Sequence, residues 1–325
     1  MPFRLLSPRL RFRLPAALVL LLGLLGPVSA AETKLRAVAT FSILADLVAQ
    51  VGGDHVAVTS LVQPNADAHG YAPAPSDART LADANLVVVN GLGLEGWIDR
   101  LIKASGTKAP VVVASAGVKP IEAEDDGHGH DGPGHDGPGH GGPGHAHGHH
   151  DDPHAWQSIA NARIYVGNIR DALVRIDPDH AAAYADNAKA YLASLDALEA
   201  EVRTGIAAIP MAQRRIITTH DAFGYFTAAY GLTFIAPQGV STDSEASPRD
   251  VARIIRQIRQ EKIPAVFLEN ISDPRLMQQI ARESGAVIGG KVFSDALSGP
   301  DGPAPTYVAM MRHNLTAFTA ALGRR

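Results

Sequence analysis

Short apolar runs alternate with amphipathic segments along the chain, and this alternation is the main structural signal in the sequence. In the first part the apolar runs cover 35–41, 55–62, 86–90 and 111–115. Runs of this length that are rich in valine and leucine are typical of buried strands. Between them, apolar residues recur at helical spacing, as over 94–105, where a helix is predicted. Strands that alternate with helices form a parallel sheet covered on both faces, so this part predicts an α/β lobe.

The same alternation returns in the second part of the chain. Its apolar runs cover 215–219, 232–236, 265–269 and 286–289, and its helical segments cover 222–230, 247–262, 273–284 and 306–322. Two helical segments, 158–176 and one from Asp179 towards Gly205, separate the halves and are long enough for a stiff connector. The predicted fold class is α/β, with two lobes, each a mostly parallel sheet flanked by helices, joined by a rigid long helix.

Residues 1–30 have the pattern of a signal peptide. Four arginines precede the apolar run 14–25, which is too short to span a membrane comfortably. Small residues at 28–30 then offer a cleavage site before Ala31. We expect an exported, soluble mature protein. An uncleaved anchor is the alternative, and a lipid anchor would need a cysteine at the new N-terminus.

The predicted organisation therefore has four parts. After the signal peptide 1–30, the first lobe covers 31–157 and includes a His-rich flexible loop, 122–151. The connecting helices cover 158–208, and the second lobe covers 209–325.

Composition excludes several kinds of site. The chain has 325 residues, a net charge of −4 and 46% hydrophobic residues, which is typical of a globular protein without a basic surface for nucleic acid. It contains no cysteine, which excludes thiolate zinc sites, disulfides and thiol nucleophiles. Histidine, aspartate and glutamate remain as metal ligands.

A histidine-rich repeat lies between Gly127 and His150. It holds eight of the 14 histidines, interleaved with glycine and proline, and such a composition cannot bury a hydrophobic core. Because imidazole is the commonest side-chain metal ligand, the repeat indicates weak, accessory metal binding. An engineered tag or a neutral linker is the alternative. The histidines of the repeat are His128, His130, His135, His140, His145, His147, His149 and His150.

Four polar residues elsewhere have settings that suit a ligand site. His69 lies in the loop beyond the second predicted strand, His220 directly follows the fifth, and Asp295 follows the last. His154 lies just after the repeat, in the segment Asp-Pro-His-Ala-Trp. In open parallel sheets ligands bind outside the carboxyl ends of the strands, where His69 and His220 both emerge. Each loop histidine alone is equally compatible with a plain polar role, and their joint placement favours a site.

The remaining polar candidates suit structural roles. His55 begins a predicted strand, His180 lies at a helix start and His313 lies in the last helix, where surface or capping roles are expected. The segment 91–96 matches the dinucleotide-binding pattern, but the next predicted strand ends in Ser115 and not in the acidic residue that such a site requires. We expect its glycines to form a tight strand-to-helix turn.

Five motifs together carry a resemblance to a known family. They are His-Gly-Tyr-Ala-Pro-Ala-Pro-Ser-Asp at 69–77, Asn-Gly-Leu-Gly-Leu-Glu-Gly-Trp at 90–97, Asp-Pro-His-Ala-Trp at 152–156, His-Asp-Ala-Phe-Gly-Tyr-Phe at 220–226 and Ser-Asp-Ala-Leu at 294–297. With them the chain resembles the periplasmic solute-binding proteins of zinc and manganese ABC importers over about residues 35–322. The resemblance implies two α/β lobes bridged by a rigid helix, one metal between them, and no enzymatic activity.

Carried over position by position, the resemblance implies a specific ligand set. His69 and His154 from the first lobe and His220 and Asp295 from the second would bind the metal. Manganese-type members usually carry glutamate at the position of His220, whereas three imidazoles and one carboxylate suit zinc. The histidine-rich insertion also resembles the zinc branch. Some zinc members have an acidic residue next to the first histidine; Ala68 stands there, which leaves a role for Asp67 open.

The implied function is high-affinity capture of Zn²⁺ in the periplasm and delivery to an ABC transporter permease in the inner membrane, by a monomer. A periplasmic zinc chaperone that contacts the repeat is a second candidate partner. The alternatives are a dual-specificity manganese and zinc binding protein, a periplasmic zinc buffer or chaperone, and a zinc hydrolase with Asp295 as the base. No HExxH motif supports the hydrolase.

Overall fold

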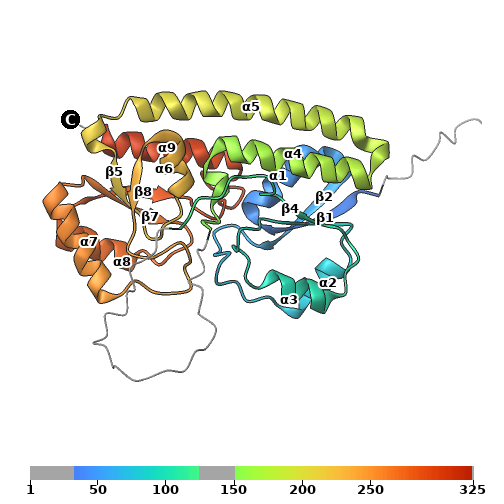
Figure 1. Cartoon of the computed structure of the whole chain (residues 1–325), viewed down its shortest axis with the longest axis horizontal. Coiled ribbons are helices and arrows are strands. Elements are labelled where there is room, and N and C mark those ends of the chain that lie inside the picture. The colour runs from blue at the N-terminus through green and yellow to red at the C-terminus, as the bar shows by residue number, and fades with distance from the viewer. Residues whose placement is uncertain (1–32, 124–150, 324–325) are drawn as a thin grey trace, which may run out of the picture. The chain divides into compact units, whose positions relative to one another are not determined.

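The computed structural model describes residues 33–123 and 151–323 (Figure 1). The predicted signal peptide and all eight histidines of the repeat lie outside these ranges. The chain from Lys34 onward forms one compact unit. In the described ranges, no helix combines the length and apolar character needed to cross a membrane.

Four parallel strands form the first sheet, in the order β2-β1-β3-β4. The strands are β1 (Leu35–Phe41), β2 (Val56–Val62), β3 (Leu86–Val89) and β4 (Val111–Val113), and the helices between them are α1 (Ser42–Gly52), α2 (Pro75–Ala82) and α3 (Ile98–Ser105). All four residues of β3 are buried, because helices cover both faces of the sheet (Figure 1). The α/β prediction for this lobe is confirmed.

The second sheet repeats this topology, in the order β6-β5-β7-β8, with all strands parallel. Its strands are β5 (Arg215–Ile217), β6 (Thr233–Ile235), β7 (Ala265–Glu269) and β8 (Val287–Val292), and its helices are α6 (Gly224–Tyr230), α7 (Pro248–Glu261), α8 (Arg275–Ser284) and α9 (Tyr307–Leu322). Ser247 caps α7 as its sequence predicts, accepting a hydrogen bond from the backbone N–H of Asp250.

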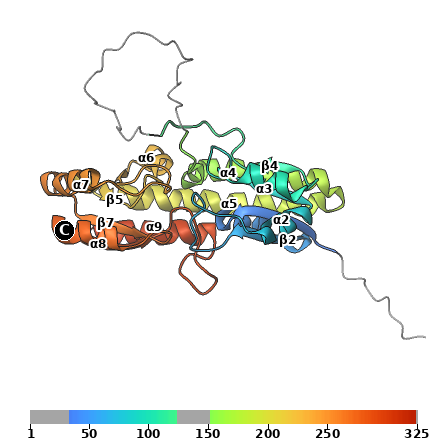
Figure 2. The ribbon, with the colours of Figure 1, turned by 90° about the horizontal axis from the view of Figure 1, so that it is seen from below.

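Two long helices join the lobes. They are α4 (Ile159–Ile176) and α5 (Ala181–Ala207). The 27 residues of α5 span about 40 Å at 1.5 Å per residue. Helix α5 packs against α1 and α4 of the first lobe and against α9 of the second, and therefore bridges both (Figures 1 and 2).

A tryptophan just before α4 ties the first lobe to the second. Trp156 is fully buried, and its Nε1 donates a hydrogen bond of 3.0 Å to the carbonyl of Ser294. Gln157 donates to the same carbonyl at 2.9 Å, and the Tyr307 hydroxyl donates to the Trp156 carbonyl at 2.7 Å. Ser294 precedes Asp295, so this joint also anchors a predicted ligand.

Two element boundaries differ from those predicted by more than two residues. The helix predicted from residue 94 begins at Ile98, because the preceding residues turn around buried Glu95, whose carboxylate accepts the N–H groups of Asn90 and Gly91. The last strand continues to Val292, with an irregularity in its pairing to β7 near Gly290, where φ is +130°.

We expect Tyr307→Phe to lower the free energy of unfolding by about 1–3 kcal/mol, because it leaves the buried Trp156 carbonyl without its hydroxyl donor. Tyr191→Phe is the matched control, since the buried Tyr191 hydroxyl has no hydrogen-bond partner in the described ranges. Urea denaturation of both variants measures the difference. Equal losses in the two variants would contradict the proposed role of the Tyr307 hydroxyl in the joint.

Candidate metal centre

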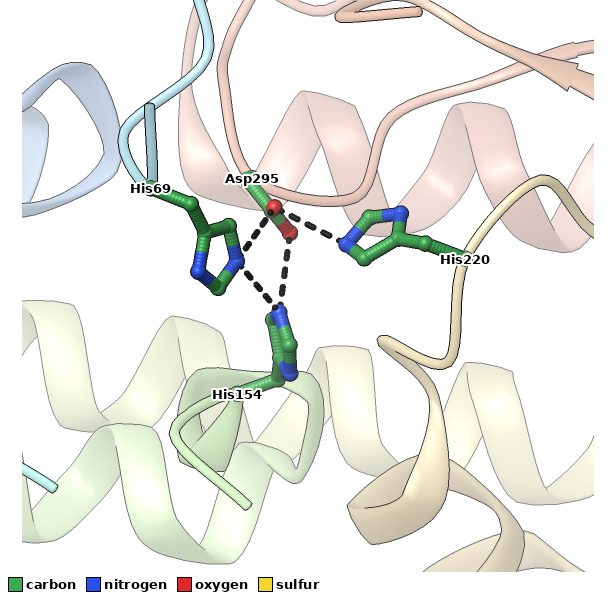
Figure 3. Close-up of side chains that lie close together, drawn as sticks. All are labelled: His69, His154, His220 and Asp295. Atoms are coloured by element: carbon green, nitrogen blue, oxygen red, sulfur yellow. Dashed lines mark hydrogen bonds and ion pairs between the residues drawn. The ribbon is translucent and has the colours of Figure 1, made fainter. Parts of the chain in front are cut away.

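The four side chains predicted as ligands come together between the lobes (Figure 3). His69 lies in the loop after β2, His220 follows β5 and Asp295 follows β8. His154 lies directly before the short 3-10 helix Ala155–Gln157 that leads into α4. The three loops begin at the carboxyl ends of parallel strands, which is where an open α/β sheet binds its ligands.

The donor atoms of this cluster face one another at short range. Nε2 of His220 lies 3.0 Å from Asp295 Oδ2, and Nε2 of His69 lies 3.3 Å from the same oxygen. Nε2 of His154 lies 3.2 Å from Nε2 of His69 and 3.6 Å from Asp295 Oδ1. One ligand atom from each residue lies within 4.8 Å of the others. His154, His220 and Asp295 are fully buried, and His69 is 9% exposed.

Two further carboxylates lie behind the histidines. Asp152 Oδ1 accepts both the ring Nδ1–H and the backbone N–H of His154, each at 2.8 Å. Glu269 Oε2 accepts the Nδ1–H of His220 at 2.5 Å. Such bonds leave Nε2 free to bind a metal and make it more basic. The sequence reasoning did not include these two residues. Glu269, a lone charge at the end of an apolar strand, was the available signal.

Each charged group in the cluster stabilises the charged form of its neighbours. Burial by itself disfavours the charged forms, but the Asp295 and Asp152 carboxylates outweigh it and raise the pKa of His154 to about 9. In the same way Glu269 and Asp295 raise the pKa of His220 well above its usual value. These imidazoles in turn hold the pKa of Asp295 well below its usual range, against its burial.

The residues fit a cation. Asp295 Oδ1 is buried and accepts no hydrogen bond in the described part of the chain, so one lone pair of a fully buried carboxylate faces the cluster without a donor. Three imidazole nitrogens and a carboxylate oxygen within reach of one point form the kind of donor set that Zn²⁺ takes in proteins.

The other candidate residues do not reach this centre. Asp67 is engaged elsewhere, since its carboxylate accepts the backbone N–H of His69 at 2.9 Å and the hydroxyl of Thr242 at 2.6 Å. His55 stacks on His180 with 4.0 Å between ring centroids, and His313 Nε2 lies 2.9 Å from the Lys291 carbonyl. All three histidines are partly exposed, and none belongs to the cluster.

A cleft leads from the surface to His69. It has a volume of about 590 Å³, and Tyr71, Trp97, Asp151 and Asp243 are among its lining residues. His69 is the only member of the four-residue cluster that lines this cleft. The cleft therefore offers a route for an ion to the centre, with carboxylates along it.

The sequence is similar to those of known metal-binding proteins. A family model described as "Zinc-uptake complex component A periplasmic" matches residues 37–321. The chain is 35% identical to the iron-binding protein YfeA of Yersinia pestis over 98% of both chains. It is 34% identical to the manganese-binding lipoprotein MntA of Halalkalibacterium halodurans over 89% of each chain.

Solved structures give the same picture. The periplasmic zinc binding protein TroA from Treponema pallidum superposes with a TM-score of 0.79 at 29% identity, over 90% of this chain and 100% of that one. A manganese-bound periplasmic metal binding protein mutant from Candidatus Liberibacter asiaticus superposes with a TM-score of 0.76 at 30% identity, over 89% of this chain and 100% of that one.

We expect the metal-free protein to lose stability as pH rises from about 6.5 to about 9. The folded pKa of His154 is raised to about 9, so the stability that its proton contributes is fully present below 6.5 and disappears as pH passes the folded value. The loss should be on the order of 1–3 kcal/mol. Urea denaturation with a chelator present, at several pH values, measures it. His154→Gln should make the profile shallower, with a remaining slope from His220, whose pKa is also raised. A wild-type profile that rises over this interval would contradict the assignment.

Proposed function

The chain belongs to the family of periplasmic zinc-uptake component A proteins, the substrate-binding components of metal ABC transporters, and we propose that its own substrate is Zn²⁺. In this proposal the protein captures one Zn²⁺ ion in the periplasm and delivers it to a membrane permease. The observation that carries the proposal is the convergence of three imidazole nitrogens and one carboxylate oxygen within 4.8 Å.

The donor set supports zinc over its competitors. Zn²⁺ prefers four-coordinate sites of nitrogen, sulfur and a few oxygen ligands, whereas Mn²⁺ is better served by more oxygen. The surroundings of position 220 also suit an imidazole. Glu269 Oε2 accepts a hydrogen bond there, and a glutamate in place of His220 would bring a second carboxylate against it.

A dual-specificity site is the second candidate, and the relatives named for iron and manganese favour it. Both oxygens of Asp295 face the cluster, Oδ2 towards His69 and His220 and Oδ1 towards His154. Two oxygens from one carboxylate would supply a fifth donor, which suits Mn²⁺ better than a single oxygen.

The arrangement also supports a release mechanism. The ligands belong to both lobes, so a permease that shifts one lobe on docking would separate His69 and His154 from His220 and Asp295. Because a buried cation is stable only with its full donor set, a small displacement would weaken binding strongly. The cleft beside His69 then provides the exit.

The histidine-rich repeat has an accessory role in this proposal. The described residues that flank it, Glu122 and Asp151, pair in an antiparallel bridge, and Asp151 lies three positions before His154. This attachment tethers the eight histidines beside the centre, which raises the local concentration of weakly held zinc. A periplasmic zinc chaperone that donates to the repeat is a partner in the same scheme.

The geometry favours binding over hydrolysis. A hydrolytic zinc site keeps three protein ligands, an open position and a separate carboxylate base. Here Asp295 lies 3.0–3.6 Å from all three histidines, within the ring of donors and not beyond it. A permease and an ATPase encoded beside the gene would distinguish transport from a periplasmic zinc buffer.

We expect one tight Zn²⁺ site in the mature protein, to be measured by competition titration against a chromophoric chelator. Deleting residues 124–150 should remove weak extra sites and leave the tight one intact. His220→Ala should weaken the tight site by more than the roughly 10–100-fold that loss of an outer hydrogen-bond partner costs. His313→Ala is the control, because His313 binds a backbone carbonyl away from the centre. Loss of the tight site on deletion of the repeat would contradict the assignment.

Metal preference is a separate prediction. We expect Zn²⁺ to displace Mn²⁺ and Fe²⁺ from the loaded protein, and an excess of either ion to leave bound Zn²⁺ in place, because the donors are mainly imidazole. Dialysis against mixed metals followed by elemental analysis measures this. Equal occupancy by Mn²⁺ and Zn²⁺ would replace the zinc proposal by the dual-specificity one.

A further inference from the structure

The contacts of Glu269 determine which nitrogen of His220, one of the predicted ligands, carries the ring proton. We propose that Glu269 is a positioning residue which holds His220 in the single tautomer able to bind the metal, and that an amide cannot take its place. This inference rests on the proposed function, because it concerns how one of the four ligands is prepared for Zn²⁺.

In the described part of the chain, the Glu269 carboxylate contacts four hydrogen-bond donors. Its Oε1 accepts the backbone N–H groups of Thr219 at 2.7 Å and His220 at 3.1 Å. Its Oε2 accepts the His220 Nδ1–H at 2.5 Å and the Ser294 hydroxyl at 2.9 Å. The side chain is fully buried, so water does not replace these bonds.

These contacts determine where the imidazole proton sits. A carboxylate only accepts hydrogen bonds, so the neutral ring of His220 carries its proton on Nδ1. Nε2 then keeps its lone pair, and this atom lies 3.0 Å from Asp295 Oδ2 in the centre. The tautomer that binds metal through Nε2 is therefore imposed by Glu269.

An amide at this position would reverse the tautomer. The two backbone N–H groups are obligate donors, so the amide oxygen must occupy the place of Oε1. The NH₂ group then faces Nδ1 of His220, which must accept, and the proton moves to Nε2 and blocks it. Turning the amide over instead would leave the two buried N–H groups without an acceptor, which is unfavourable because buried donors need a partner.

Asp152 provides a matched contrast in the other lobe. One oxygen, Oδ1, accepts both the backbone N–H and the Nδ1–H of His154. An amide can keep its oxygen there, and its NH₂ group would take the place of Oδ2 beside a cleft of about 910 Å³ that Asp152 lines. The same carboxylate-to-amide change therefore preserves the tautomer of His154 and reverses that of His220.

The experiment compares Zn²⁺ affinity in Glu269→Gln, Glu269→Ala and Asp152→Asn, with urea denaturation of each metal-free variant. We expect Asp152→Asn to lose less than about 10-fold in affinity and Glu269→Gln about 100-fold, the two ends of the range for outer partners. Glu269→Ala should be less stable than Glu269→Gln and yet bind Zn²⁺ more tightly, because nothing then forces the proton onto Nε2. A purely structural role predicts that affinity follows stability.

Nitrogen-15 NMR of the imidazole rings is the second measurement, and it does not depend on any variant folding. In the zinc-loaded wild type, His220 should bind through Nε2 and carry its proton on Nδ1. Ligation through Nδ1 would overturn the proposal, as would equal affinities of Glu269→Gln and Asp152→Asn. If His220→Ala keeps wild-type affinity, the proposed metal site itself fails. If His220→Ala loses tight binding and Glu269→Gln keeps it, the metal site stands and only the proposed role of Glu269 fails.

Discussion

The fully buried carboxylate of Asp295 is the group on which the metal centre depends. Burial of a charge is unfavourable unless partners compensate for it, and three imidazole nitrogens lie 3.0–3.6 Å from its oxygens. His69 and His154 belong to the first lobe and His220 to the second. The compensation therefore exists only while the lobes hold their relative positions. Without a metal, protons on the imidazoles partly compensate for the Asp295 charge. A bound cation would take over this compensation from the protons.

The surrounding fold meets this requirement with a buried, hydrogen-bonded joint next to the centre. Trp156 and Gln157 donate to the Ser294 carbonyl, one residue from Asp295, and Tyr307 donates to the Trp156 carbonyl. Helix α5 runs along both lobes behind this joint. Because packed interiors move between discrete arrangements and do not deform continuously, a shift of one lobe would disturb several ligands together. Such coupling suits the proposed release of the metal when a permease docks.

The three histidines differ in burial and in their Nδ1 hydrogen bonds, so the two sides of the centre are not equivalent. His154 and His220 are fully buried and each has its Nδ1–H bound by a carboxylate. His69 has some exposure and lines the cleft that leads to the surface. The more exposed side of the cluster therefore faces the cleft, and its fully buried side does not.

Local sequence determined the order of the elements and most of their extents. Apolar runs and helical spacing are properties of neighbouring residues, so strands such as Leu35–Phe41 and Ala265–Glu269 could be placed without a structure. The ligand candidates could be named as well, because a histidine that follows a strand of a parallel sheet lies at its binding edge. The start of α3 could not be placed in this way, because it depends on a turn around the buried Glu95 carboxylate.

Only the tertiary structure decided which carboxylate accepts the Nδ1–H of His220. Glu269 and His220 lie 49 positions apart, and their contact arises because β5 and β7 are neighbours in the sheet. No local pattern records which oxygen of a carboxylate meets which donor. Sequence by itself determined that this protein has histidine and aspartate side chains at the binding edges of two parallel sheets. The packing of the lobes brought those edges together and set Glu269 against His220, because these residues are distant along the chain and adjacent only in the folded protein.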